Sequence, residues 1–107
     1  TCVAPGFVLE VIQVLNEENL SNLSSQLSKV QIDRCTYDSS VQAGYIYLLQ
    51  PKPTSHVEDL QRGVVDTFAF AAPYWFNIDV DQSGSIYGIE FLGRRDVFDK
   101  LREAHML

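Results

Sequence analysis

The residues best suited to chemistry lie in one acidic segment, N-I-D-V-D-Q-S-G-S-I-Y-G-I-E-F-L, from Asn77 to Leu92. Its side chains match positions one, three, five, six and twelve of a calcium-binding EF-hand loop: Asp79, Asp81, Ser83, Gly84 and Glu90. Carboxylate and hydroxyl oxygens at that spacing can surround a calcium ion. One interpretation of the segment is therefore a metal site built from Asp79, Asp81, Ser83 and Glu90.

The same segment also fits two strands joined by a tight turn at Ser83-Gly84, where glycine supplies the positive φ. Period-2 alternation then pairs apolar side chains on one face: Val80 with Tyr87, Ile78 with Ile89, and Phe76 with Phe91. The other face carries three further pairs: Asp81 with Ile86, Asp79 with Gly88, and Asn77 with Glu90. An EF-hand needs a helix on each side of its loop, but Pro73 precedes the segment and Gly93 follows it. The pattern favours the hairpin, and a looser cation site on one sheet face stays as the alternative.

Other catalytic or metal-binding patterns are missing from the sequence. It contains no G-x-S-x-G, P-loop or H-E-x-x-H motif, and neither His56 nor His105 has a partner at metal-ligand spacing. Cys2 and Cys35 form no C-x-x-C pair, and Cys35 fits a small core residue. Trp75 is expected in the core rather than as a binding anchor. We therefore expect a protein without enzymatic activity or cofactor, and an enzyme with an unrecognised site is a second alternative.

Length and charge restrict the possible partners. The 107 residues fit one domain, residues 1–107, and 46% of them are hydrophobic, which is enough for a core. No apolar run approaches the roughly 20 residues that span a bilayer, and no basic-then-apolar leader is visible. The net charge of -6 disfavours nucleic acid and anionic membranes and suits a basic protein partner. We expect a cytoplasmic protein, and the sequence does not give its oligomeric state.

Apolar spacing predicts the elements around the acidic segment. Two N-terminal helices follow from helical stripes, with Asn16 as a cap of the second and the serines between the leucines exposed. A strand stays as the alternative for the first stripe, because Val8, Val11, Ile12 and Val14 are β-branched. The stripes consist of Phe7, Val8, Val11, Ile12 and Leu15, then Leu20, Leu23, Leu27 and Val30. Strands are expected over Val30 to Tyr37, Gln42 to Gln50 and Val64 to Ala71, with a loop from Pro51 to Arg62.

A last amphipathic helix is expected over Asp96 to His105, with an inward stripe of Val97, Phe98, Leu101 and Ala104. The nearly continuous apolar run from Tyr45 to Leu49 is typical of a central strand covered on both faces. Because helices and strands are segregated along the chain, we predict an α+β fold. It would be an antiparallel sheet of about four to five strands, with two N-terminal helices and one C-terminal helix packed on it.

Two stretches, T-Y-D-S-S-V-Q-A-G-Y-I-Y-L (Thr36 to Leu48) and the acidic segment, resemble a family of small bacterial proteins known as domain of unknown function 2283. That family typically shows Y-D-x-x-x-D-A-x-Y-I-x-L and then D-x-D-x-x-G-x-I-x-G-I-E-I-L. Gln42 replaces the usual acid and Gly44 the frequent leucine, and the resemblance covers about half of the chain. The stretch F-A-F-A-A-P-Y-W and the N-terminal helices look like additions.

The family has no established activity, so the resemblance supplies no catalytic residues. Its members are sometimes encoded beside small toxins, which implies an immunity protein or an antitoxin. Together with the acidic composition, this suggests a protein that binds and neutralises a basic toxin. The acids expected to contribute to the binding surface are Glu58, Asp59, Asp66, Asp79 and Asp81.

Overall fold

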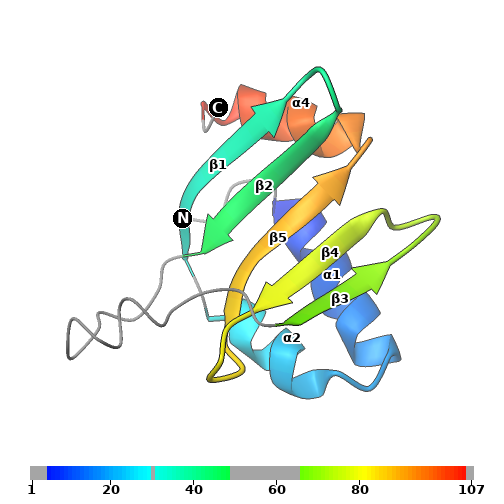
Figure 1. Ribbon diagram of the computed structural model, residues 1–107, viewed down its shortest axis with the longest axis vertical. Coiled ribbons are helices and arrows are strands. Elements are labelled where there is room, and N and C mark those ends of the chain that lie inside the picture. The colour runs from blue at the N-terminus through cyan, green and yellow to red at the C-terminus, as the bar shows by residue number, and fades with distance from the viewer. Residues whose placement is uncertain (1–4, 30, 49–65, 106–107) are drawn as a thin grey trace.

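The computed structural model describes residues 5–29, 31–48 and 66–105 and shows an α+β fold (Figure 1). Two N-terminal helices and one C-terminal helix lie behind a five-stranded antiparallel sheet in this view. In chain order the elements are α1 (Pro5–Glu17), α2 (Ser21–Leu27), β1 (Ile32–Asp38), β2 (Ala43–Leu48), β3 (Asp66–Phe70), β4 (Phe76–Val80), β5 (Ile86–Leu92) and α4 (Arg95–Glu103). The predicted fold class is therefore confirmed, while the expected loop from Pro51 to Arg62 lies outside the described residues.

The strand order in the sheet is β1-β2-β5-β4-β3, so β5 is the central strand. The prediction that the Tyr45 to Leu49 strand is covered on both faces is wrong. In β2 the side chains of Ile46 and Leu48 are buried, but Tyr45 and Tyr47 on the opposite face are only half-buried. The described helices pack on one face of the sheet (Figure 1). Tyr45 and Tyr47 alternate with the buried Ile46 and Leu48 and therefore lie on the other face.

The hairpin formed by β4 and β5 confirms most of the expected register. Four predicted pairs are present: Phe76 with Phe91, Asn77 with Glu90, Ile78 with Ile89, and Asp79 with Gly88. At the turn the prediction is wrong, because a β-bulge between Asp79 and Val80 pairs Val80 with Ile86 instead of Tyr87. Gly84 has the expected positive φ of 85°, but the connection spans residues 81–85 and is not a two-residue turn.

The core lies between the helices and the inner face of the sheet. Its fully buried side chains include Phe76, Ile89 and Phe91 from the sheet and Leu101 from α4. Leu23 and Leu27 of α2 are buried as expected, as is Cys35 of β1. None of the described helices is long and apolar enough to cross a membrane.

Two local expectations for the helices are wrong. Asn16 does not cap α2, whose N-cap position is Leu20; instead, its Oδ1 accepts a hydrogen bond of 2.6 Å from the hydroxyl of Ser24. Ser24 is consequently buried at 6% exposure, whereas the sequence suggested a solvated serine face. Ala104 lies exposed just after α4, so only Val97, Phe98 and Leu101 of the expected stripe face inward.

Two glycines inside strands make room for aromatic rings on opposite faces of the sheet. A Cβ on Gly44 would collide with the buried ring of Phe91, and a Cβ on Gly88 would collide with the ring of Tyr45. Each ring therefore lies directly over backbone that a larger residue would cover. The first contact packs the core, and the second fixes a tyrosine on the side away from the described helices.

Candidate functional site

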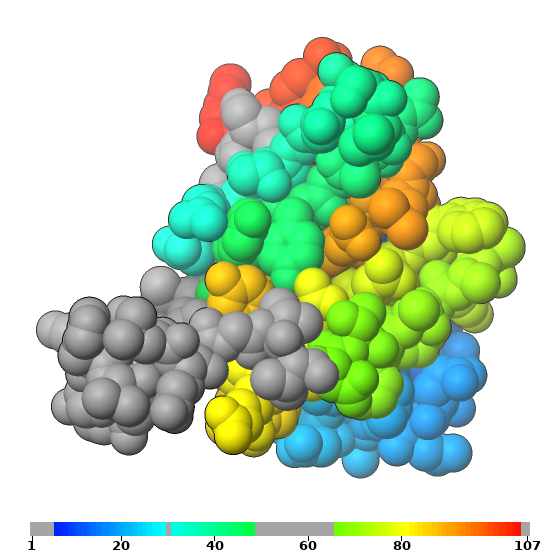
Figure 2. Space-filling view, viewed as in Figure 1, coloured from blue at the N-terminus to red at the C-terminus, as the bar shows by residue number. Residues whose placement is uncertain are grey.

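The face of the sheet that points away from the helices carries tyrosines and hydrogen-bonded carboxylates. We call it the open face; Figure 2 looks onto it. It is formed by Arg34, Tyr45, Tyr47, Thr67, Asn77, Asp79, Tyr87 and Glu90. Its three tyrosines are half-buried and adjacent, with ring centroids 4.5 Å apart for Tyr45–Tyr47 and 6.3 Å apart for Tyr47–Tyr87. Tyrosine rings held on a rigid sheet are well suited to contact another protein.

Asp79 is held by two hydroxyl groups. Its Oδ2 accepts a hydrogen bond of 2.7 Å from the Tyr45 phenol, and its Oδ1 accepts one of 2.7 Å from the Thr67 hydroxyl. Burial, together with the Asp79 carboxylate, raises the pKa of Tyr45 well above its usual value. Tyr45 therefore stays protonated as a donor at neutral pH, and Asp79 is oriented as its charged acceptor.

Glu90 is the second oriented carboxylate of the open face. Its Oε1 accepts a hydrogen bond of 2.9 Å from the side-chain amide of Asn77, its cross-strand neighbour. Glu90 does not pair with Arg94 or Arg95, whose guanidinium groups bind other carboxylates. Glu90 and Asp79 thus present two fixed negative charges on one side of the sheet.

Asp81 has a structural role in the turn. Only 5% exposed, it accepts three hydrogen bonds through Oδ1, from the backbone amide of Ser83 (2.9 Å), the Ser83 hydroxyl (2.7 Å) and the backbone amide of Ser85 (3.0 Å). The segment connects two strands instead of two helices, so it does not form an EF-hand. Among the described residues, no three His, Cys, Asp or Glu side chains gather as a possible metal site.

Three of the five acids expected at the binding surface come together at one end of the β3–β4 pair. In the register of these strands, Asp66 lies opposite Val80, and Thr67 lies opposite Asp79. We call Asp66, Asp79 and Asp81 the acidic corner. Asp66 is exposed, Asp79 lies on the open face, and Asp81 is buried beside them. The remaining two acids, Glu58 and Asp59, lie outside the described residues.

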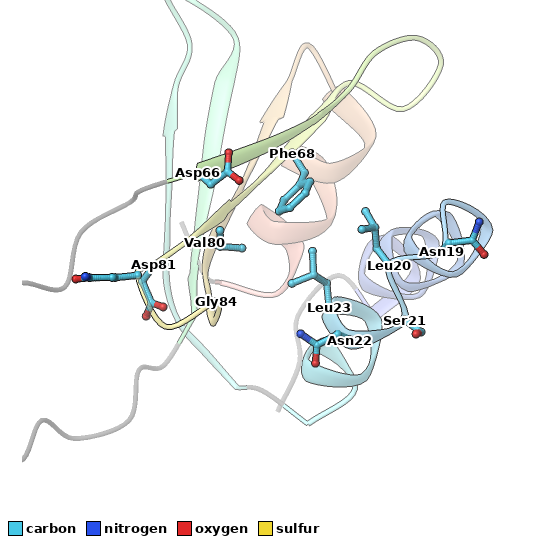
Figure 3. A pocket seen from close by; sticks show the side chains of 11 residues that line it. Asn19, Leu20, Ser21, Asn22, Leu23, Asp66, Phe68, Val80, Asp81 and Gly84 are labelled. Carbon is cyan, nitrogen blue, oxygen red and sulfur yellow. The ribbon is translucent and has the colours of Figure 1, made fainter.

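A hollow of about 480 Å³ adjoins the acidic corner on the helix side of the sheet (Figure 3). Its apolar lining comes from both layers: Leu20, Leu23, Phe68 and Val80. Its polar lining includes Asn19, Asn22, Asp66 and Gln82. Figure 3 shows Leu20 and Leu23 pointing from the helical side toward Phe68 on the sheet. The open face and this hollow therefore meet at the same edge of the molecule.

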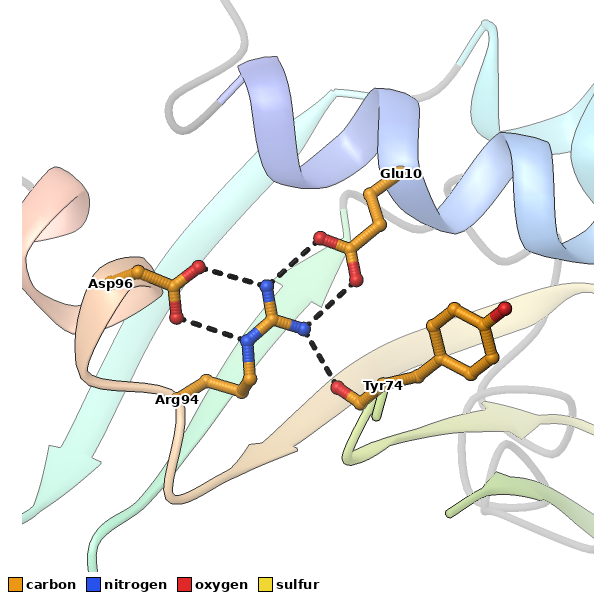
Figure 4. Close-up of polar contacts among 4 residues, drawn as sticks. All are labelled: Glu10, Tyr74, Arg94 and Asp96. Atoms are coloured by element: carbon orange, nitrogen blue, oxygen red, sulfur yellow. Dashed lines mark hydrogen bonds and ion pairs between the residues drawn. The ribbon is translucent and has the colours of Figure 1, made fainter. Parts of the chain in front are cut away.

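Arg94 joins three parts of the chain, a role that the sequence analysis missed (Figure 4). Its guanidinium donates to both oxygens of Glu10 on α1 (2.8 and 2.9 Å) and to both oxygens of Asp96 on α4 (2.8 and 2.9 Å). It also donates to the backbone carbonyl of Tyr74 at 2.7 Å. Asp96 and Glu10 raise the pKa of Arg94, so it stays charged. Arg94 therefore fixes α1, α4 and the β3–β4 connection together.

Trp75 is another residue whose position differs from the expectation. Its side chain is 47% exposed, so the prediction of a core residue is wrong. Its φ of 53° is uncommon for a bulky residue, and its carbonyl accepts a hydrogen bond of 2.9 Å from the amide of Leu92. This bond connects the β3–β4 turn to the end of β5 and holds the indole at the surface.

No family model, curated protein or solved structure matches this chain. The resemblance to domain of unknown function 2283 consequently stays a prediction. The geometry of the open face, the acidic corner and the hollow is the basis for assigning a function.

Proposed function

We propose that this chain is a small, non-enzymatic, cytoplasmic interaction protein, an immunity protein or antitoxin, that binds and neutralises a basic toxin. The observation that carries the proposal is the open face, which combines half-exposed tyrosines with two oriented carboxylates. Protein interfaces are enriched in tyrosine at their centre, and complementary charge directs the encounter of the partners. The net charge of -6 agrees with a basic partner.

The hydrogen bonds of the open face favour binding over catalysis. Tyr45 and Thr67 both donate to Asp79, which orients the carboxylate before any partner arrives. A carboxylate that is already fixed loses little conformational entropy when it pairs with an incoming lysine or arginine. Of the acids expected here from sequence, Asp79 is hydrogen-bonded to Tyr45, so charge and aromatic surface would contact the same partner.

The first experiment uses the product of the adjacent gene as the candidate toxin. We expect calorimetry to show stoichiometric binding that weakens as salt is raised, because the contact is between opposite charges. The substitutions Glu90→Gln and Tyr87→Thr should each weaken binding at least tenfold, since both alter the open face. Glu90→Gln keeps an oxygen for the Asn77 amide, so the fold should persist.

Glu103→Gln is the matched control, because Glu103 is an exposed acid at the end of α4, on the helix side of the sheet. It removes the same charge as Glu90→Gln and should leave the affinity within about twofold of wild type. Equal affinities for all three variants would contradict the proposed surface. A toxin-like neighbour that shows no binding at all would contradict the proposed function.

A further inference from the structure

The hollow beside α2 combines an apolar floor with an acidic rim. Leu23 and Val80 in its floor are each 6% exposed, and Leu20 and Phe68 are partly buried around them. A volume of about 480 Å³ falls within the range of small-molecule pockets. The floor therefore suits an aliphatic stem rather than a compact ion.

The rim carries negative charge and unused acceptors. Asp66 and Asp81 line the hollow, and the described residues that line it include no lysine, arginine or histidine. None of the described basic side chains forms an ion pair with Asp66, and among the described residues its Oδ1 accepts a bond of 2.9 Å from the adjacent Thr67 amide. Among the described residues, no hydrogen bond is made by the side-chain amides of Asn22 and Gln82, which lie exposed on the rim.

We propose that this hollow binds an arginine side chain presented by a segment of the basic partner. The aliphatic part of the arginine lies along Leu23 and Phe68, and the guanidinium reaches the Asp66 carboxylate. Long cationic side chains commonly bury their methylene groups while the charged end remains near water and polar atoms. This inference rests on the proposed function. It adds that the partner contributes an arginine and that the hollow is the site that binds it.

Arginine fits the rim better than lysine does. A guanidinium has five donors in a plane, whereas an ammonium has three donors at one point. The rim offers a carboxylate at Asp66 and amide oxygens at Asn22 and Gln82. Several separated acceptors around an apolar floor match the planar group, which can donate in more than one direction.

The test is a titration of the full chain, followed by amide NMR, with N-acetyl-arginine methylamide as the probe. We expect selective shifts at Leu23, Phe68 and Val80. N-acetyl-citrulline methylamide has nearly the same shape without the charge, and N-acetyl-lysine methylamide has the charge without the planar group. The citrulline probe should bind about two- to fivefold more weakly, the range expected for loss of an exposed charge pair of up to about 1 kcal/mol. The lysine probe should also bind more weakly, because its ammonium donates from one point and cannot reach the separated acceptors.

Variants of exposed residues keep the fold intact. Asp66→Asn keeps an oxygen for the Thr67 amide and should weaken arginine binding about two- to fivefold. Asn22→Asp adds a carboxylate to the rim and should strengthen it. Asp33→Asn on β1, at the other edge of the sheet, is the control and should have no effect.

The inference is overturned if the arginine and citrulline probes bind equally, if lysine binds as tightly as arginine, if Asp66→Asn is neutral, or if the shifts lie elsewhere. Its failure is distinguishable from failure of the proposed function. If the toxin binds through Glu90 and Tyr87 but the arginine probe causes no shifts at the hollow, only the arginine-binding inference is overturned. If the arginine probe shifts the resonances at the hollow but no toxin binds, the proposed function is overturned and the arginine site of the hollow stands.

Discussion

We expect the substitution Arg94→Lys to lower the free energy of unfolding by about 2 kcal/mol, and Arg94→Met by about 3 kcal/mol. The side chain of Arg94 is 13% exposed and makes five hydrogen bonds, to Glu10, Asp96 and the Tyr74 carbonyl. Its guanidinium also lies 5.3 Å from the centre of the Phe7 ring. The charge is therefore embedded where three segments of the chain meet.

The magnitude follows from the exposure of each acceptor. A lysine has three donors, so at least two of the five acceptor positions lose their partner, and a hydrogen bond to a charged group contributes about 1.5–3 kcal/mol. Asp96 is 66% exposed, so water replaces most of what it loses. Glu10 is only 33% exposed, and the Tyr74 carbonyl accepts a short hydrogen bond of 2.7 Å from Arg94. Most of the decrease in the free energy of unfolding should therefore come from the bonds lost at these two groups. Methionine removes the charge as well, which leaves Glu10 half-buried and unpaired.

The assay is urea unfolding at neutral pH. With a slope of about 2 kcal/mol per molar, Arg94→Lys should shift the midpoint by about 1 M. The neighbouring Arg95 is the control, because it is 75% exposed and its contacts are a 3.2 Å pair with Asp99 one turn later and the Phe98 ring, whose centre lies 5.5 Å from the guanidinium. Arg95→Lys should stay within about 0.5 kcal/mol of wild type. An Arg94→Lys protein as stable as the Arg95→Lys protein would refute the assignment of Arg94 as the connection between α1, α4 and the β3–β4 turn.

Three further predictions concern the turn, the open face and pH. Asp81→Ala removes the acceptor of three hydrogen bonds and should cost about 2 kcal/mol in thermal unfolding, while Asp81→Asn, which keeps Oδ1, should cost less; equal costs would contradict the acceptor role. Gly88→Ala should displace the Tyr45 ring, cost about 1–3 kcal/mol and change the near-UV dichroism, and an unchanged spectrum would count against it. The Arg94 guanidinium holds the pKa of Asp96 below its usual 3.8, so the stability from this pair is complete above that value and is lost as pH falls through the lower folded pKa. The stability difference between wild type and Arg94→Met should accordingly narrow in urea melts below about pH 4, and a constant difference down to about pH 2 would contradict this.

The sequence predicted the β4–β5 register well because alternation is a local property of the two strands. Four cross-strand pairs were correct, and the error began at Val80, where the bulge occurs. Asp81 explains the error at the turn, because its carboxylate accepts hydrogen bonds from the backbone amides of Ser83 and Ser85. These bonds stabilise a connection that is longer than a two-residue turn. Hydrogen bonds from one side chain to nearby backbone compete with regular pairing, and an apolar pattern does not report them.

The parts of the site that the sequence did not predict depend on tertiary placement. Arg94 and Arg95 are adjacent and chemically identical, and only the docking of α4 decides that Arg94 turns inward to Glu10. The exposure of Trp75 likewise follows from the position of the β3–β4 turn. Thr67 and Asp79 are twelve positions apart, and the pairing of β3 with β4 brings the hydroxyl to the carboxylate, while Asp66 lies on the opposite face at the hollow. Composition indicated that acids matter, but not which of them share a surface.

The proposed function accounts for a difference between the two faces of the sheet. On the inner face, Phe91 over Gly44 completes an apolar core, which stabilises the fold directly. On the outer face, Tyr45 over Gly88 holds the donor for Asp79, and partly burying an ionised carboxylate opposes folding unless its hydrogen bonds compensate. An apolar pair at these two positions would stabilise the sheet at least as well. Under the proposed function, a fixed carboxylate next to half-buried aromatic rings is advantageous when a cation of another protein arrives, because the carboxylate is already oriented and partly desolvated.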